Sequence, residues 1–166
     1  MKRIVGIDPG THRIGYALLE AVSRRPRLLA AETITLPPRP TTAERLLVIE
    51  RALTTRLKRD RPDGVAIEQL FFSKNVKTAL SVAEARGIIL LTAFRTARSI
   101  WEYTPLAVKL AVTGYGRADK EQVRRTIRAL FPHERLPEGD DAIDAIAIAL
   151  TAVYTTPPQP AIPTHS

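Results

Sequence analysis

The 166-residue sequence predicts an α/β fold: a five-stranded mixed sheet, with the first three strands antiparallel and helices on both faces. Three apolar segments rich in β-forming residues come first, and the short turns between them favour an antiparallel meander. Helical and strand patterns then alternate, which favours parallel strands joined by helices. The length suits a single hydrophobic core, so we expect one domain over residues 1–154.

Local signals place the elements in order along the chain. After the third strand, the proline-rich stretch 37–40 breaks the pattern, and Thr41 or Thr42 is suited to cap a helix that runs to about Asp60. The inward face of that helix is expected to carry Leu46, Leu47, Ile49, Leu53 and Leu57. Strands are expected at 3–8, 14–20, 27–36, 63–68 and 99–103, and the other helices at 75–97, 105–112, 119–131 and 140–154.

The final residues, 155–166, carry Pro157-Pro158-Gln159-Pro160 and lack the apolar periodicity of a core element. We expect this tail to be disordered.

The charge balance indicates a polyanionic partner. The chain has 25 Lys and Arg against 17 Asp and Glu, a net charge of +8, which favours nucleic acid over an anionic membrane surface. The absence of cysteine excludes disulfides, thiolate zinc sites and a cysteine nucleophile. No apolar run reaches the ~18 residues of a membrane helix, and no signal-peptide pattern opens the sequence. We therefore expect a cytoplasmic protein without a membrane partner.

Four carboxylates lie at the ends of apolar segments: Asp8, Glu68, Asp141 and Asp144. The first two each close a strand, and functional side chains collect at the carboxyl ends of strands in open α/β sheets. The other two are three residues apart at the start of the last helix, so they share a face. Gathered acids repel one another unless a cation joins them, and hard oxygen ligands suit Mg²⁺ or Mn²⁺. Two such ions would support phosphodiester hydrolysis.

A purely structural interpretation of these acids is also open. Asp8 precedes Pro9-Gly10 and suits a turn, while Asp140, Asp141 and Asp144 suit the positive end of a helix. Asp140 follows a glycine and is the expected N-cap of the last helix. For each acid alone this interpretation is as good as the metal site, but the combination with Glu68 favours the metal.

Several motifs, in order along the chain, resemble the RuvC family of Holliday-junction resolvases. They are Gly6-Ile7-Asp8-Pro9-Gly10, Gly15-Tyr16, Ala66-Ile67-Glu68-Gln69 with Phe71 and Lys74-Asn75, Glu84-Ala85-Arg86-Gly87, and Asp141-Ala142-Ile143-Asp144-Ala145-Ile146-Ala147-Ile148-Ala149. The resemblance implies a ribonuclease-H-like fold, a homodimer, two Mg²⁺ ions per active site with Mn²⁺ able to substitute, and paired symmetric nicks in four-way DNA junctions. It also implies a branch-migration complex of RuvA and RuvB type proteins as a partner.

The resemblance also implies roles for single residues. It makes the four acids both catalytic groups and metal ligands, assigns functional lysines to Lys109 and Lys120, and makes Phe71 the aromatic that contacts a base. The glycine-rich approach to Lys120 is expected to bring its ammonium near the scissile phosphate or the attacking water. Further DNA contacts fit this picture at Lys74, Lys77, Arg117 and Arg124. The helix expected at 75–97 is apolar on more than one face, which suits a dimer interface.

Three alternatives remain open at this point. Residues 6–15 also match the opening motif of small ribonuclease-H-like proteins that process RNA, although Ala66-Ile67-Glu68-Gln69 and the last helix favour the resolvases. An actin-like ATPase shares the glycine-rich opening but needs two such halves. A protein that binds junctions without cutting them is expected to lack one of the acids. The sequence leaves open the preferred cleavage site, the physiological metal and the branch-migration partner.

Overall fold

The computed structural model describes residues 1–22, 25–38, 41–69 and 76–155, and a mixed sheet of strand order β3-β2-β1-β4-β5 lies at its centre. The elements are β1 (Lys2–Asp8), β2 (Arg13–Val22), β3 (Arg25–Thr35), α1 (Thr42–Asp60), β4 (Gly64–Glu68), α2 (Val76–Phe94), β5 (Ser99–Tyr103), α3 (Pro105–Thr113), α4 (Lys120–Leu130) and α5 (Asp140–Tyr154). Each expected element is present. The largest change of boundary is in the helix expected to reach residue 97, which ends at Phe94.

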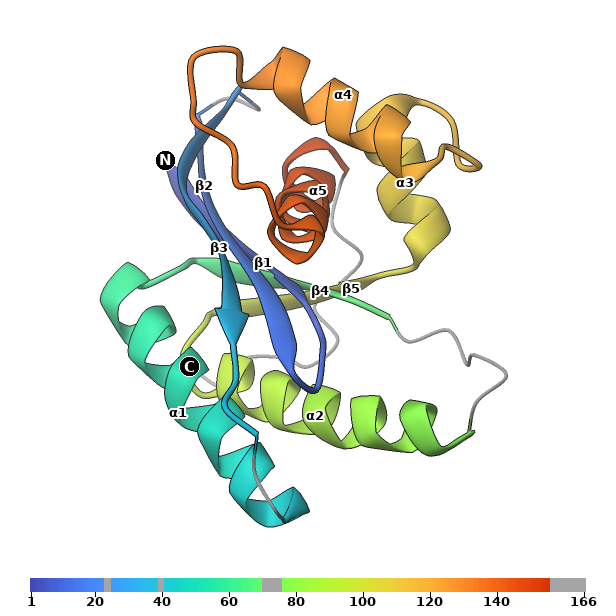
Figure 1. Cartoon of the computed structure of the whole chain (residues 1–166). Helices are drawn as coiled ribbons and strands as arrows, with labels where there is room; N and C mark the ends of the chain where they lie inside the picture. Colours follow the sequence, from blue (N-terminus) through green and yellow to red (C-terminus); the bar gives the residue numbers. More distant parts are fainter. Residues whose placement is uncertain (23–24, 39–40, 70–75, 156–166) are drawn as a thin grey trace.

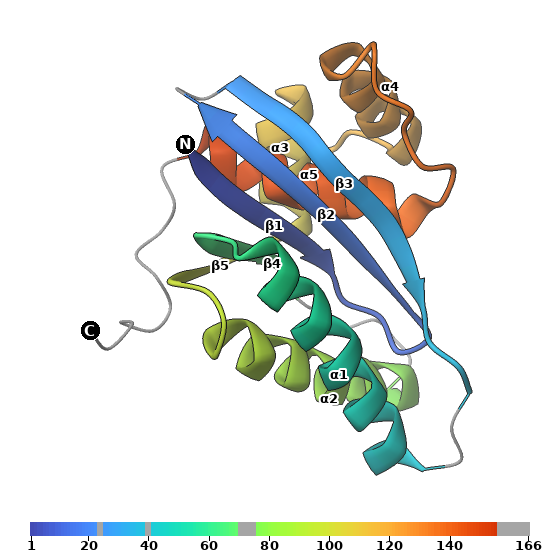
Figure 2. The same cartoon turned by 90° about the vertical axis from the view of Figure 1, so that its left-hand side faces the viewer.

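The sheet is antiparallel on one side and parallel on the other. β1 pairs antiparallel with β2, and β2 with β3, whereas β4 runs parallel to both β1 and β5. Helices α1 and α2 cover one face, and α3, α4 and α5 lie on the other (Figures 1 and 2). The predicted fold class is confirmed. No helix in the described ranges is long and apolar enough to cross a membrane.

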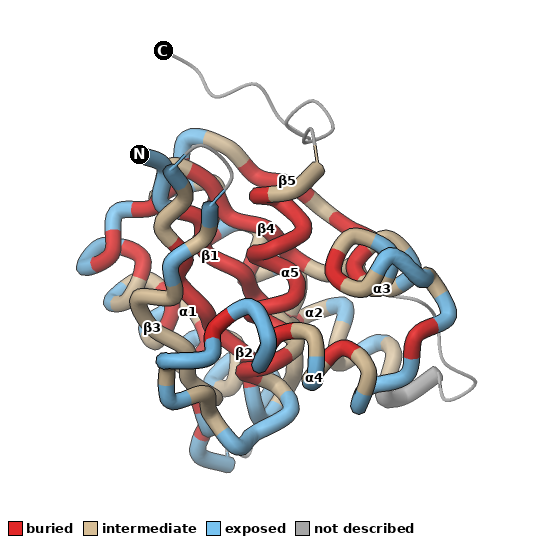
Figure 3. Tube along the Cα trace, turned by 90° about the horizontal axis from the view of Figure 1, so that it is seen from above, coloured by how far each residue is buried: buried red, intermediate tan, exposed pale blue. Residues whose placement is uncertain are grey.

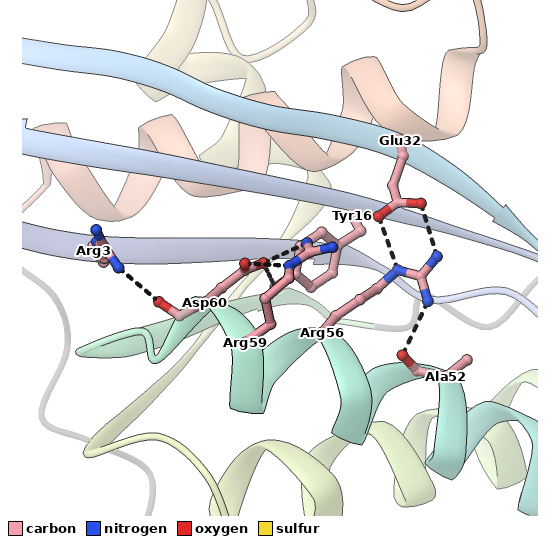
Figure 4. Close-up of polar contacts among 7 residues, drawn as sticks. All are labelled: Arg3, Tyr16, Glu32, Ala52, Arg56, Arg59 and Asp60. Atoms are coloured by element: carbon pink, nitrogen blue, oxygen red, sulfur yellow. Dashed lines mark hydrogen bonds and ion pairs between the residues drawn. The ribbon is translucent and has the colours of Figure 1, made fainter.

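Helix α1 is fixed to the sheet by polar contacts as well as by its apolar face. Tyr16 on β2 is buried and donates from its hydroxyl to Asp60 Oδ2 at 2.8 Å, and both oxygens of Asp60 accept from Arg59 at 2.7 and 2.9 Å (Figure 4). One turn earlier, Arg56 donates to both oxygens of Glu32 on β3 at 2.8 Å. A buried carboxylate is stable only when it is paired in this way.

The structure confirms the predicted start of α1 but not every residue predicted on its inward face. Thr41 forms a capping box with Glu44, as expected from their spacing. Ile49, Leu53 and Leu57 are buried, but Leu47 is 46% exposed, so its predicted inward position was wrong. Leu47 precedes Ile49 by two residues, which at 3.6 residues per turn places it on the opposite side of the helix.

Helix α5 lies directly on the sheet and is the most deeply buried helix, as Figure 3 shows in red. Every residue from Ala145 to Val153 is buried. A Cβ atom at Gly6 would collide with the backbone of Ala145 and Ala149. A Cβ at Gly15 would collide with the carbonyl oxygen of Asp141. These two glycines therefore let the helix backbone touch β1 and β2, and this contact sets the position of the acids on its first turns.

We predict that Gly6→Ala lowers the free energy of unfolding by more than about 3 kcal/mol, because the obstructing atoms are helix backbone, which cannot rotate away as a side chain can. Urea unfolding of the purified variant measures this loss. The matched control is Gly87→Ala in α2, where a Cβ meets nothing within 4 Å. That variant is expected to gain about 0.5–1 kcal/mol, as alanine does over glycine in a helix. Equal stability of the two variants would refute the proposed contact.

Candidate active site

Two carboxylates meet at the carboxyl edge of the sheet. Asp8 is the last residue of β1 and Glu68 the last of β4, and these strands are parallel neighbours with Ile7 opposite Ile67. Asp144 of α5, Lys109 of α3 and Lys120 of α4 line the same pocket of about 370 Å³. Its remaining walls are Pro105, Val108, Val123 and Ala147. The pocket thus brings acids and lysines together from five elements.

The three acids of the pocket, Asp8, Glu68 and Asp144, are partly buried and repel one another when charged. Burial, and after it the charges of Asp144, Glu68 and Asp141, raises the pKa of Asp8 to about 8. Burial followed by the charge of Asp144 raises the pKa of Glu68 to about 7. Burial also raises the pKa of Asp144 above its ordinary value, while Lys120 opposes the shift. Such carboxyls are suited to take up a cation, which would replace the bound protons.

Two cations already pair with acids at this edge. Arg13 Nε lies 3.3 Å from Asp141 Oδ2 at the start of β2, and Lys120 Nζ lies 3.7 Å from Asp144 Oδ2. Asp141 raises the pKa of Asp8 through its charge, although it does not line the pocket. Within the described residues, no group of three or more Asp, Glu or His side chains converges in the geometry of a metal cage.

The chemistry of the donors fits a hard divalent cation. The four side chains offer only carboxylate oxygens, the ligands preferred by Mg²⁺ and Mn²⁺. The two at the strand ends, Asp8 and Glu68, have no ion pair among the described side chains, so their oxygen atoms are available to a metal.

The predicted role of Asp140 as an N-cap was wrong. The N-cap of α5 is Gly139, with no side-chain cap, and Asp140 is the first residue of the helix. Its carboxylate accepts from Arg124 Nη2 at 2.5 Å, and both Nη atoms of Arg124 also approach the carbonyl oxygen of Glu138, at 3.3 and 3.4 Å. A guanidinium binds a carboxylate more strongly than a backbone amide does, which explains the change. The pair ties the start of α5 to α4.

The other predicted DNA contacts fall in several places. Arg117 is exposed in the connection between α3 and α4, and Lys120 is exposed at the first turn of α4. Phe71 and Lys74 lie outside the described residues, as does the side chain of Lys77. The guanidinium of Arg124 is engaged with Asp140 and Glu138.

Sequence reasoning missed Arg13, although it pairs with one of the four acids. Its only signal was its place just before Gly15, on the strand that neighbours β1. That signal does not reveal a partner on the last helix, more than a hundred residues further along the chain.

Comparisons with known proteins agree with this geometry. The family model described as crossover junction endodeoxyribonuclease RuvC matches residues 4–152. RuvC of Moorella thermoacetica is 47% identical over 147 residues, covering 89% of this chain and 88% of that protein. The structure of T. thermophilus RuvC in complex with a Holliday junction substrate superposes with a TM-score of 0.84 at 32% identity, covering 93% and 94% of the two chains. The yeast mitochondrial Holliday junction resolvase Ydc2, at 11% identity and TM-score 0.70, shares the fold over 92% of this chain and 79% of its own.

The raised pKa values predict how stability depends on pH without metal. The folded protein holds protons on Asp8 and Glu68 more tightly than the unfolded chain does. Their contribution to the free energy of unfolding is therefore complete below about pH 4 and is lost as pH rises toward 8. The melting temperature in EDTA is therefore expected to fall over this range, and Asp8→Asn to flatten the fall. The control Glu121→Gln removes an exposed acid outside the pocket and is expected to keep the wild-type slope. A wild-type slope in Asp8→Asn would contradict the burial argument.

Proposed function

The chain belongs to the RuvC family of crossover junction endodeoxyribonucleases, and from that premise we propose that it resolves four-way DNA junctions by hydrolysing phosphodiester bonds in paired, symmetric nicks. The observation that carries the proposal is the pocket at the carboxyl edge of the sheet, where Asp8, Glu68 and Asp144 share one space with Lys109 and Lys120. Junction DNA is present in the solved complex of the similar T. thermophilus RuvC. The net charge of +8 suits the same polyanionic substrate.

Asp8, Glu68, Asp141 and Asp144 are proposed to hold two Mg²⁺ ions, with Mn²⁺ able to substitute. When bound, these ions supply activation of the attacking water and stabilisation of the leaving oxygen. The carboxyls of Asp8 and Glu68 would give up their protons on binding a cation, since burial, and after it the charges of neighbouring acids, keeps their pKa near or above neutrality. The buried apolar walls at Val108 and Val123 lower the local polarity and so strengthen the charge interactions beside them.

Lys120 and Lys109 are proposed to act on the phosphate. The ammonium of Lys120 lies 3.7 Å from Asp144 Oδ2. Because Asp144 is one of the proposed metal ligands, this ion pair holds Lys120 beside the proposed metal site. A cation there attracts a scissile phosphate and stabilises the charge that develops on it. Lys109 lines the same pocket from α3. Its positive charge lowers the pKa of Glu68, whereas burial raises it.

Contacts further along the DNA follow from the resemblance. Arg117, exposed beside α4, is proposed to bind the phosphate backbone, as are Lys74 and Lys77, and Phe71 is proposed to contact a base at the junction centre. Arg124 would reach a phosphate only by sharing its guanidinium with Asp140. Its role on DNA is therefore proposed as secondary.

A homodimer is proposed, with α2 at the interface. Leu80 and Leu91 on this helix are 63% and 44% exposed, although the same helix buries Ala85, Ile89 and Ala93 in the core. An isologous pair places two pockets across a two-fold axis, which accounts for symmetric nicks. RuvA and RuvB type proteins as partners, a cytoplasmic location and a nuclease domain over residues 1–154 complete the proposal. The predicted disordered tail lies, from residue 156 on, outside the described residues.

The test compares three substrates in Mg²⁺: a synthetic four-way junction, a linear duplex and single-stranded RNA. We predict cleavage of the junction, and a loss of at least about 10²-fold in Asp8→Asn and Glu68→Gln, the scale found when an electrostatic stabiliser of a transition state is removed. Junction affinity is expected to stay within a few-fold in both variants, because phosphate contacts come from lysine and arginine.

Asp140→Ala is the matched control, since Asp140 pairs with Arg124 and, unlike Asp141 and Asp144, is not among the charges that raise the pKa of Asp8. It is expected to keep most cleavage, whereas Asp141→Ala and Asp144→Ala lose nearly all of it. Preference for RNA would favour the RNA-processing alternative, and substantial nicking by Asp8→Asn would overturn the assignment of the acids.

A further inference from the structure

A second pocket lies at the opposite edge of the sheet from the acids. It has a volume of about 590 Å³ and lies where α1 and α2 end, just before β4 and β5 begin. Leu57 and Pro62 are buried at its floor. Its other lining residues are Lys58, Arg61, Asp63, Arg95, Thr96 and Arg98. Because β4 has five residues, this pocket is about 16 Å along the strand from Glu68.

The four cations of this pocket are exposed and unpaired. Across the part of the chain that the structure describes, none of Lys58, Arg61, Arg95 and Arg98 forms an ion pair or a side-chain hydrogen bond. The single acid, Asp63, accepts from the backbone N–H of Arg3 at 2.8 Å. Elsewhere on α1, by contrast, Arg56 and Arg59 are paired with Glu32 and Asp60.

Helix dipoles do not account for this concentration of charge. Basic residues are favourable at a helix C-terminus, which carries about half a negative charge. The C-terminal ends of α1 and α2 each contribute about half a negative charge, and the carboxylate of Asp63 contributes one. Together they offset about half of the four positive charges. The remaining excess is close to the charge of one phosphate group.

The backbone of Arg61 ends helix α1 in a conformation that is unusual for arginine. It caps α1 in the left-handed conformation, with φ 45° and ψ 60°, and is the one non-glycine residue with positive φ in the described ranges. Glycine or asparagine usually occupies such a cap, because an L side chain is strained there. An arginine at this position therefore adds backbone strain to the repulsion among the neighbouring cations.

We propose that this pocket binds phosphate groups, as a site separate from the active-site pocket and beyond the proposed cleavage function. Arginine binds phosphate oxygens with two parallel N–H donors, and the exposed guanidinium groups of Arg61, Arg95 and Arg98 are free to do so. The phosphate comes either from a nucleic acid backbone or from a small phosphorylated molecule.

The test is calorimetric titration of the full chain with inorganic pyrophosphate in EDTA. Wild-type protein is expected to bind, and Arg61→Gly and Arg98→Gln to bind at least tenfold more weakly. Arg51→Gln removes an exposed charge from the same helix outside the pocket, and Arg135→Gln removes one from the connection between α4 and α5. Both are expected to bind like wild type. Equal affinity in all proteins, or an equal loss in either control, would overturn the proposal.

Arg61→Gly separates binding from folding. Because glycine adopts the left-handed cap freely, its melting temperature is expected to match or exceed that of wild type while pyrophosphate binding is lost. A lower melting temperature together with unchanged binding would contradict both the strain argument and the site.

Repeating the titration with saturating four-way junction identifies the source of the phosphate. Loss of pyrophosphate binding assigns the pocket to the nucleic acid backbone, and unchanged binding assigns it to a small phosphorylated molecule. Neither measurement requires cleavage, so failure of the proposed nuclease function leaves this test intact.

Discussion

The contact between α5 and the first two strands is the constraint on which the site depends. Without side chains at Gly6 and Gly15, the helix backbone comes as close to the strands as atoms allow. That proximity brings Asp141 and Asp144 beside Asp8, whose strand β1 already places it next to Glu68. The acids are therefore gathered by backbone packing in the core, where positions are rigid, rather than by a surface loop.

The second constraint on the site is electrostatic. A chain of net charge +8 concentrates acids in one partly buried pocket and surrounds them with Lys109 and Lys120. The lysines lower the repulsion without neutralising the strand-end acids, whose pKa values stay high because burial outweighs them. Such a site is suited to exchange its protons for the metal cations proposed above, and its positive surroundings suit a polyanion.

The sequence allowed the fold and the meeting of Asp8, Glu68 and Asp144 to be predicted because each has a local signal, whereas the choice of Asp141 over Asp140 rested on the family resemblance. Strand runs ending in an acid, such as Val65-Ala66-Ile67-Glu68, show both the element and its functional end. Contacts between distant segments have no such signal. The pairing of Asp140 with Arg124 on α4 displaced the expected N-cap, and the pairing of Asp141 with Arg13 depends on how α5 lies on β2. Local propensity indicates which residue is best suited to cap a helix, but an ion pair with a distant segment can outweigh that preference.

Proton release on metal binding tests most directly whether the buried acids form the metal site. Titrating Mg²⁺ or Mn²⁺ into the protein at pH 7, in two buffers of different ionisation enthalpy, gives the number of protons released for each ion bound. We predict net release in wild type, since Asp8 and Glu68 have pKa values of about 8 and 7, and a smaller release with weaker binding in Asp8→Asn. Metal binding without proton release, or equal binding by Asp8→Asn, would contradict the account.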